Sequence, residues 1–494
     1  MVKQFFLVMV LLLGLHACKD DNDLKVKPSP NPWEAERIPA VYVLNSSGVV
    51  VASFGYPGSK GKLSLSSLPE IPDTITCRTE NVNPLHSALL WARTNNFRDV
   101  RLDAATYTFD EPQVYSFLGK IGFRVPSNIH LKGVMINGVP VSVLAPSQSL
   151  VDKAKLSASK SSFDILLLPF DSPTGDVTVM TNNTTIESIF IDNKNAGAVC
   201  MWANGGDNFK LLSVYAQASN ISSLILGFYY SQENPKLPYT SMINYARNFE
   251  IAKCRVLSAN GDAICAIGKK GIVHDNICEN GNKTGNADNG LTCFIGSDSI
   301  QFIDNQIHDF TCGIGLDGSY LSPNLAGMSA EASLSLCLQK EKELYRHWTG
   351  YNRNIEIARN SIWNCNRGIV LWRGTNISIH DNTVSNCLQE GISLEESMQN
   401  TVWNNQIKGC NIACRLTSST ESAVDVNGNA IGTSNNNIGY NLSGGNPGNN
   451  FIYNNIGIQF YKPDPAKGWI CNNLFINNDV SHCTSSMPTD KVCY

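Results

Sequence analysis

Charged residues are scarce in this chain of 494 residues. Asp, Glu, Lys and Arg make up 16% of it, and the formal net charge at pH 7 is −4. Lys and Arg form no cluster, whereas nucleic-acid-binding proteins carry a basic patch or stripe. We therefore predict that nucleic acid is not a partner. Little charge together with abundant Asn favours a sheet-rich protein with polar turns over a helical one.

Motifs for metals and nucleotides are also missing. No CxxC pair and no His/Cys spacing typical of a metal site occurs in the sequence. The glycine-rich stretch GGNPGNN lacks both the Lys and the strand-to-helix context of a phosphate-binding loop. The sequence therefore predicts no cofactor and no metal.

Long apolar runs are limited to the N-terminus. The run from Phe5 to Leu15 follows Lys3 and is too short for a stable membrane anchor. It leads into Leu15-His16-Ala17-Cys18, which resembles the bacterial lipobox. That resemblance implies a signal peptide over residues 1–17 and lipidation at Cys18. An ordinary secretory signal followed by a chance cysteine is the alternative.

The residues after Cys18 are acidic. The stretch KDDND, residues 19–23, resembles the surface-export signal of Bacteroidetes lipoproteins. This resemblance implies an exported protein on the outer membrane or cell surface, attached to the membrane through a lipid at Cys18.

A repeat of 22 or 23 residues is present in the second half of the chain. Asn360, Asn382 and Asn405 recur at this spacing, and each unit holds three short runs of alternating apolar residues. Alternation with a period of two marks strands. Three strands per unit with such short turns make one coil of a three-sided helix, whose strands pair in parallel with the next coil. The predicted asparagine column extends backwards through Asn305, Asn276, Cys254, Val214 and Asn193.

The 16 cysteines would indicate disulfides in a short secreted chain. However, Cys365, Cys387 and Cys410 follow the spacing of the repeat. We predict that they form one buried column of small apolar side chains. Cys483 and Cys493 near the C-terminus are the predicted disulfide pair.

These coils resemble the pectin-lyase-like superfamily of right-handed parallel β-helices. The stretch NPLHSALLWARTNNFRDVRLDAATYTF resembles the capping helix and first strands of that family, and FRVPSNIHLKG resembles the entry into the stack. The resemblance implies an all-β solenoid with an N-terminal capping helix. It implies little about activity, because the superfamily includes lyases, hydrolases, epimerases, transferases and adhesins.

The expected organisation has five parts. They are a signal peptide at 1–17, a proline-rich tether at 18–40, a small β element at 41–82, the β-helix at 83–480 and a tail at 481–494. The β element is expected to pack on the end of the helix, and an independent domain there is the alternative.

Members of the superfamily mostly place their sites on the first sheet of each coil. In this chain the inward positions of that sheet are predicted to be Leu291, Cys293, Ile314, Leu316, Ile369, Leu371, Ile392 and Leu394. The predicted outward column is then Phe294, Asp317, Trp372, Glu395 and Arg415. A register error of one residue would bring Arg373 and Glu396 outward instead, because side chains change faces with each step.

This column predicts carbohydrate chemistry. Asp317 and Glu395 lie two coils apart, ~9.6 Å between backbones, and inverting glycosidases separate their carboxyls by about 6.5–9.5 Å. Apolar neighbours would keep Asp317 protonated as an acid, and Arg415 would keep Glu395 ionised as a base. Trp372 would stack on a sugar ring. A solvated face with an ion pair at its rim is the alternative.

Insertions between strands are expected to wall this groove. The longest lies between Gly318 and Asn352 and carries Arg346, His347 and Trp348. Long loops on a rigid scaffold commonly carry function. We expect a surface enzyme that degrades a polysaccharide by hydrolysis, or by elimination with Arg346, His347, Arg373 or Arg415. A non-catalytic glycan binder or adhesin remains the alternative.

Overall fold

The computed structural model describes the chain in segments. The described residues are 40–55, 84–109, 113–115, 119–157, 163–169, 180–217, 222–229, 243–258, 260–281, 288–294, 296–318, 352–417, 436–439, 448–461, 468–471, 473–478, 480–484 and 492–493. Cys18, the tether, Arg346, His347 and Trp348 lie outside these residues.

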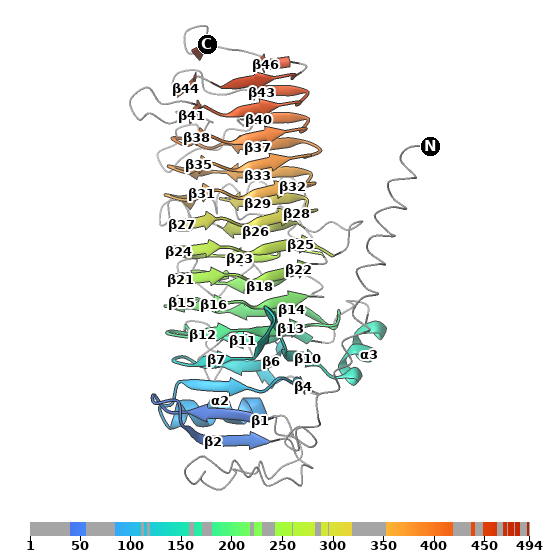
Figure 1. Ribbon diagram of the computed structural model, residues 1–494, viewed down its shortest axis with the longest axis vertical. Coiled ribbons are helices and arrows are strands. Elements are labelled where there is room, and N and C mark those ends of the chain that lie inside the picture. Colours follow the sequence, from blue (N-terminus) through green and yellow to red (C-terminus); the bar gives the residue numbers. More distant parts are fainter. Residues whose placement is uncertain are drawn as a thin grey trace, which may run out of the picture.

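The described chain forms a right-handed parallel β-helix, as predicted (Figure 1). Its three long faces are an 18-stranded, a 12-stranded and a 13-stranded sheet, which we call sheets A, B and C. One coil consists of β31 (Glu356–Ala358), β32 (Ser361–Trp363) and β33 (Arg367–Trp372). These strands pair in parallel with β35 (Ser378–His380), β36 (Thr383–Ser385) and β37 (Glu390–Glu395) of the next coil. Each strand of this coil pairs with the matching strand of the coil before it and of the coil after it. The coils therefore stack along one axis.

Sheet C carries the predicted site. Its strands in chain order are β5 (Gln113–Tyr115), β6 (Gly119–Val125), β11 (Phe163–Pro169), β14 (Gly197–Ala203), β18 (Ser222–Leu226), β23 (Ile264–Ala266), β26 (Asn289–Phe294), β29 (Cys312–Asp317), β33, β37, β40 (Ile412–Thr417), β43 (Ile456–Tyr461) and β46 (Val480–Thr484).

The other two sheets complete the coils. Strands of sheet A include β12 (Thr185–Glu187), β16 (Lys210–Leu212), β21 (Ala246–Ala252), β24 (Gly268–His274), β27 (Asp298–Ile303) and β38 (Thr401–Trp403). Strands of sheet B include β13 (Ile189–Asp192), β17 (Tyr215–Gln217), β22 (Arg255–Ser258), β25 (Ile277–Asn280), β28 (Gln306–His308), β39 (Gln406–Lys408) and β42 (Asn450–Ile452).

A cap covers the N-terminal end of the stack. Helix α2 (Pro84–Thr94) buries Leu85, Ala88, Leu89 and Ala92, which recur at helical spacing. Beside it, β1 (Ala40–Leu44) pairs antiparallel with β2 (Val50–Gly55) and with β3 (Asp99–Leu102). The side chains of β1, β2 and α2 belong to the same continuous core as the coils. The predicted capping helix is therefore confirmed. A second helix, α3 (Gln148–Leu156), lies outside the stack (Figure 1).

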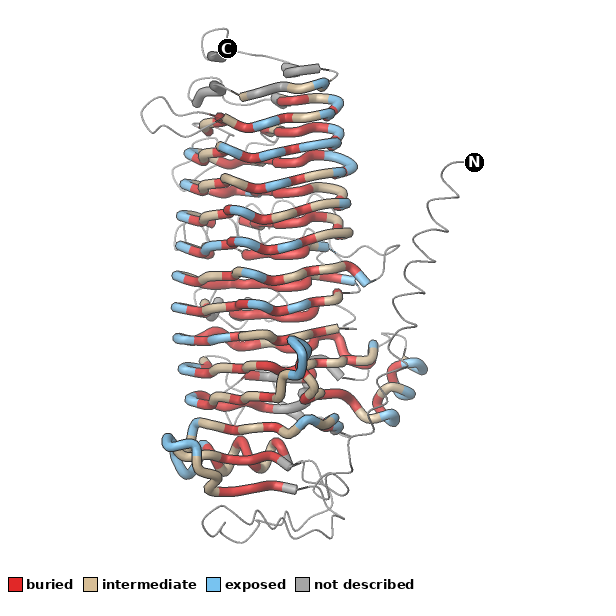
Figure 2. The backbone as a smooth tube through the Cα atoms, viewed as in Figure 1, coloured by how far each residue is buried: buried red, intermediate tan, exposed pale blue. Residues whose placement is uncertain are grey.

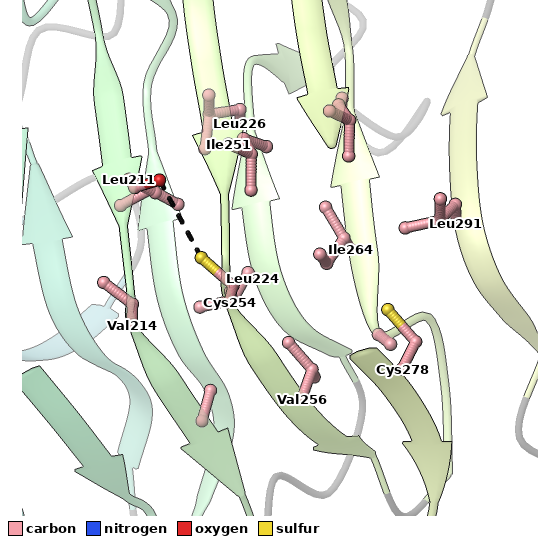
Figure 3. Packing of buried hydrophobic residues seen from close by; sticks show 14 of the residues in the cluster. Leu211, Val214, Leu224, Leu226, Ile251, Cys254, Val256, Ile264, Cys278 and Leu291 are labelled. Carbon is pink, nitrogen blue, oxygen red and sulfur yellow. Dashed lines mark hydrogen bonds between the residues drawn. The ribbon is translucent and has the colours of Figure 1, made fainter. Parts of the chain in front are cut away.

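The core runs the whole length of the stack. Figure 2 shows buried positions alternating with exposed ones along the coils. In sheet C, Leu224, Ile264 and Leu291 occupy matching positions on successive strands, and all three are fully buried (Figure 3). Each such side chain contributes roughly 1.5–3 kcal/mol through removal from water. All of the predicted inward residues of sheet C are buried as expected.

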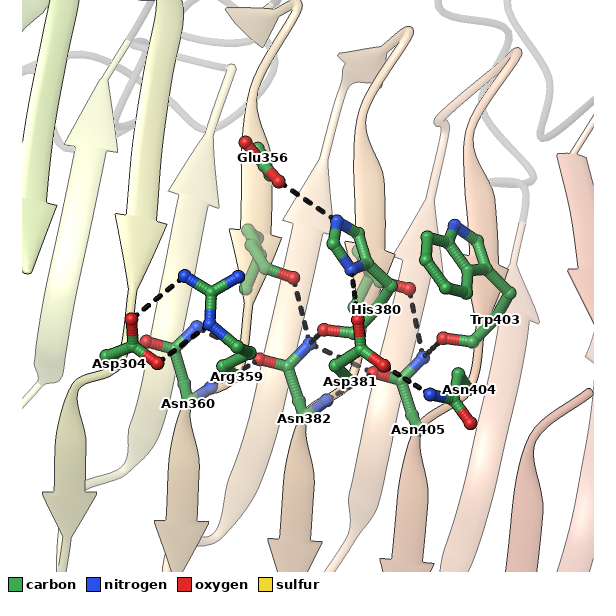
Figure 4. A network of polar contacts seen from close by, with 12 residues as sticks. Asp304, Glu356, Arg359, Asn360, His380, Asp381, Asn382, Trp403, Asn404 and Asn405 are labelled. Carbon is green, nitrogen blue, oxygen red and sulfur yellow. Dashed lines mark hydrogen bonds and ion pairs between the residues drawn. The ribbon is translucent and has the colours of Figure 1, made fainter. Parts of the chain in front are cut away.

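The asparagine column forms a continuous hydrogen-bonded ladder between sheets A and B (Figure 4). Asn276, Asn305, Asn360, Asn382 and Asn405 each donate their side-chain amide to the Oδ1 of the next asparagine along the ladder at 2.8–2.9 Å. Cys254 and Val214 hold the preceding positions, as predicted. The prediction for Asn193 is wrong, because Ile189 is in register with Val214. Asn193 belongs to the following turn, where its amide donates to the Gly197 carbonyl.

The predicted cysteine column is confirmed. Cys365, Cys387 and Cys410 follow in-register strands of sheet B, and each is buried as a free thiol. The side chains of Cys483 and Cys493 lie outside the described part, so their pairing stays a prediction. Within the described ranges, no helix is both long and apolar enough to cross a membrane.

Candidate functional site

Four of the five residues of the predicted outward column lie in one line on the outer face of sheet C. Phe294 is in register with Asp317, Asp317 with Trp372, and Trp372 with Glu395. Asp317 and Glu395 are therefore two strands apart, ~9.6 Å between backbones. Trp372 lies between them and is 40% exposed. Phe294 is half-buried and packs against a small apolar cluster that includes Ile225, Cys265 and Ile267.

Arg415 does not belong to this line, contrary to the prediction. Strand β40 places Thr417 opposite Glu395, and Arg415 lies opposite Ser393. The predicted strand ended at Leu416, which made Arg415 the last outward residue. A slip of two residues keeps a side chain on the same face, so Arg415 still faces outward, but beside Glu390.

A second line of outward-facing residues lies nearer the start of each of these strands of sheet C. It consists of Asp262, Asn289, Cys312, Arg367 and Glu390, which occupy matching positions on successive coils. Simple alternation from Ile369 and Ile392 would turn Arg367 and Glu390 into the core, and for that reason the sequence analysis missed them.

Glycine is the cause of this change of face. A Cβ on Gly368 would lie 2.5 Å from Val384 Cγ1, and one on Gly391 would lie 2.5 Å from Ile407 Cγ2. Both contacts are with core side chains, so the glycine position itself faces inward. The residue before each glycine then faces outward. The recurring glycines at 290, 313, 368 and 391 were the signal in the sequence.

Ion pairs join the two lines. Arg367 bonds through Nε to Glu390 Oε2 at 2.9 Å and through Nη2 to Glu395 Oε1. Arg415 Nη1 bonds to Glu390 Oε1 at 2.6 Å, and Ser393 Oγ donates to Glu395 Oε1 at 3.1 Å. The role predicted for Arg415, the positioning of Glu395, is therefore occupied by Arg367.

Glu390 is the centre of this network and is only 3% exposed. Burial raises the pKa of its carboxyl, but the guanidiniums of Arg415 and Arg367 outweigh burial, so the pKa lies below its ordinary value. Glu390 is consequently ionised at neutral pH and holds both arginines in place.

Asp262 lies at the other end of the second line. Its Oδ1 accepts from Asn289 Nδ2 at 2.7 Å and from the Asn289 backbone N–H at 3.2 Å. Burial raises the pKa of this carboxyl to about 6. An acid with a raised pKa on the same face as an ionised network is a common feature of functional sites.

Arg373 and Glu396 do not lie on the outward face of sheet C. They form a buried ion pair of 2.8 Å at the turns that leave β33 and β37. Their φ angles of 56° and 48° place both in the left-handed region, where the chain changes direction. The register error of one residue, which the sequence left open, is therefore excluded.

A family model described as "Periplasmic copper-binding protein (NosD)" matches residues 242–447 and 339–487. Copper sites use His, Cys and Met ligands. Among the described residues, no group of three or more His, Cys, Asp or Glu side chains gathers to hold a metal ion, and the free cysteines are buried. The described residues thus do not fit a copper centre. A search of curated protein sequences finds no match.

Solved structures resemble the whole stack. The A-module of mannuronan C-5 epimerase AlgE4 of Azotobacter vinelandii has 11% identity and a TM-score of 0.56, over 83% of this chain and 94% of the epimerase. A double mutant of the tailspike of E. coli bacteriophage HK620, in complex with a pentasaccharide, has 10% identity and a TM-score of 0.50. That likeness covers 80% of this chain and 62% of the tailspike. The likeness to these proteins shows that the chain has the right-handed parallel β-helix fold.

Proposed function

We propose that this chain is an exported enzyme that hydrolyses a polysaccharide bound along the outer face of sheet C. The observation that carries the proposal is the position of Trp372, an exposed aromatic in register between two carboxylates, Asp317 and Glu395. An indole ring on a flat sheet offers a stacking surface for a sugar ring, because the C–H face of a pyranose is apolar.

The carboxylates supply an acid and a base. The backbones of their strands are ~9.6 Å apart. The two side chains can bring the carboxyl groups closer together, towards the separation of about 6.5–9.5 Å that inverting glycosidases have. Glu395 bonds to the Arg367 guanidinium and the Ser393 hydroxyl, which hold its carboxylate in a fixed position on the sheet. We assign the base to Glu395 and the acid to Asp317.

Glu395 takes a proton from a water molecule, and the water oxygen bonds to the anomeric carbon from one face of the ring. The bond from that carbon to the glycosidic oxygen breaks, and Asp317 gives its proton to the departing oxygen. Because water attacks directly, the product has inverted anomeric configuration.

The comparisons support a polysaccharide as the ligand. The epimerase is named for mannuronan, and the tailspike structure holds a pentasaccharide. Both proteins present the same kind of stacked parallel sheets as this chain. Their low identity to it leaves the reaction to be decided by the side chains of this chain.

A glycan-binding protein is the second candidate. It is favoured by the ion network itself, because Glu390 pairs with both Arg367 and Arg415 without any ligand. Such a network can stiffen a binding surface without performing chemistry. In that case Trp372 remains the main contact and no substrate turns over.

The experiment is incubation with a panel of polysaccharides while reducing ends and the absorbance of unsaturated products are followed together. For a hydrolase, reducing ends appear without absorbance, and Asp317→Asn and Glu395→Gln each lower kcat by roughly 10²–10⁴-fold with binding retained. Asp304→Asn is the control, because Asp304 is in an ion pair with Arg359 away from sheet C.

Other outcomes decide between the remaining readings. If the absorbance of unsaturated products rises, and variants of Arg346 or His347 lose this rise, the enzyme cleaves by elimination and not by hydrolysis. Binding without turnover, weakened by Trp372→Ala, would establish the binder. If no polysaccharide binds, the proposed function is wrong.

A further inference from the structure

We infer that the polysaccharide bound on sheet C is uncharged, so that its sugar rings carry neither carboxylates nor sulfates. This inference rests on the proposed function and names its substrate class. Two features of this face favour such a ligand: the distribution of its charges and the pairing of its arginines with protein carboxylates.

The face carries more acid than base. From the coil of β23 to that of β40, the charged side chains on the outward lines are the acids Asp262, Asp317, Glu390 and Glu395 and the bases Arg367 and Arg415. The remaining outward residues there are polar or apolar, such as Asn289, Thr292, Trp372 and Ser393. With Asp317 counted as the proposed proton donor, the carboxylates of Asp262, Glu390 and Glu395 still outnumber the two guanidiniums on this described face at neutral pH, which lies above the Asp262 pKa of about 6.

Both guanidiniums are engaged by protein carboxylates. Arg367 bonds to Glu390 and Glu395 together, and Arg415 bonds to Glu390. Arg373, next to Trp372 in sequence, is buried in its ion pair with Glu396. A substrate carboxylate on this face would have to displace one of these protein carboxylates, and the displaced group would then lack its partner.

Neutral hydroxyl groups meet no such obstacle. A sugar hydroxyl is uncharged and both donates and accepts, so it can pair with the polar side chains of this face without displacing a carboxylate from an arginine. The exposed Trp372 ring can stack on a neutral pyranose in the same way. A polymer with one carboxylate per ring would instead repeat a negative charge along a face that is already negative.

The inference is tested by measuring how tightly the wild-type protein binds acidic and uncharged polymers that share the same backbone. Polygalacturonate and its methyl ester share a backbone and differ in charge and in one methyl group per esterified ring, and alginate and its propylene glycol ester form a second pair. Neutral glucans, mannans and xylans complete the panel. Affinity is measured by electrophoresis through gels that contain each polymer, at low and at high salt.

We expect gels that contain uncharged polymers to retard the protein. We also expect the protein to bind each ester at least about tenfold more tightly than the corresponding acid at low ionic strength. High salt should narrow this difference, because it screens the repulsion. If the acidic polymers bind more tightly than their esters and than the neutral polymers, the inference is overturned while the proposed function survives. If no polymer binds, the proposed function itself fails.

One variant probes the cause. Glu390→Gln removes the carboxylate that both arginines share, so affinity for polygalacturonate should rise about tenfold. Glu279→Gln is the control, because Glu279 lies on β25 of sheet B, beside Arg255. Circular dichroism melting shows whether each variant is folded. Should folded Glu390→Gln gain no affinity for the acidic polymer, pairing of the arginines does not set the preference.

Discussion

Arg367 on β33 bonds to Glu395 on β37, although Glu395 lies five residues beyond Glu390, the residue in register with Arg367. The guanidinium therefore extends along the sheet rather than directly across it. On the way it also bonds to Glu390. This one side chain connects the line of Trp372 with the line of Asp262, and it holds the proposed base in place.

We predict that Arg367→Met lowers kcat by roughly 10–100-fold with a smaller effect on KM, because an interaction that positions the base for the transition state is lost. Steady-state kinetics on the substrate polysaccharide measures both constants. Arg415→Met is the matched comparison, since Arg415 bonds to Glu390 and not to Glu395. An equal loss in both variants would contradict a specific role for Arg367. Arg367→Lys should restore only part of the rate, because Lys lacks the planar fork.

The asparagine ladder gives a prediction on stability. Asn382 accepts from the backbone N–H and the side-chain amide of Asn360 and donates to the carbonyl of Ile357. Asn382→Leu leaves these buried groups unpaired at roughly 1–3 kcal/mol each. The urea midpoint should fall clearly. Thr383→Leu, at the exposed neighbouring position, adds the same side chain without this loss. Equal midpoints in the two variants would remove the ladder as a source of stability.

Asp262 gives a prediction on pH. Its folded pKa of about 6 lies above the ordinary value of 3.8, so the folded state binds the proton more tightly than the unfolded state. Stability from this group is therefore greatest at low pH and is lost as the pH rises from about 4 to about 6, by about 3 kcal/mol. Asp262→Asn keeps an acceptor for Asn289 and removes the charge.

The Asn variant should accordingly melt higher than wild type at pH 7.5 and at nearly the same temperature at pH 4. Differential scanning calorimetry at the two pH values gives the comparison. A gain of the same size at both values would show that charge is not the cause.

The N-terminal sequence gives a prediction on location, which we carry forward as a proposal. Cys18 follows an apolar run and Ala17, and a lipid on its sulfur would fix the chain to a membrane. Cys18→Ser should appear in the soluble fraction or remain unprocessed. Cell fractionation and mass spectrometry of the N-terminus measure this. Cys77→Ser serves as the control. Normal cleavage with complete membrane retention of Cys18→Ser would speak against lipidation.

The sequence by itself determined the coil. Apolar residues at every second position bury one side of a strand, and Asn at every turn bonds its neighbour in the next coil, so the 22-residue recurrence of Asn360 and Asn382 was enough to predict stacked parallel strands. The same local rule placed Asp317, Trp372 and Glu395 in one line, because these strands alternate without interruption from Ile314, Ile369 and Ile392 onwards.

Only the tertiary structure decided which residues surround that line. Arg367 and Glu390 face outward because Gly368 and Gly391 take the inward positions, where Val384 and Ile407 leave no room for a Cβ. That outcome depends on the packing of side chains from a different sheet, and a local pattern of alternation contains no information about it. The pairing of β1 with β3 also joins residues that are far apart in the chain. It covers the open end of the core, which a local sequence pattern does not reveal.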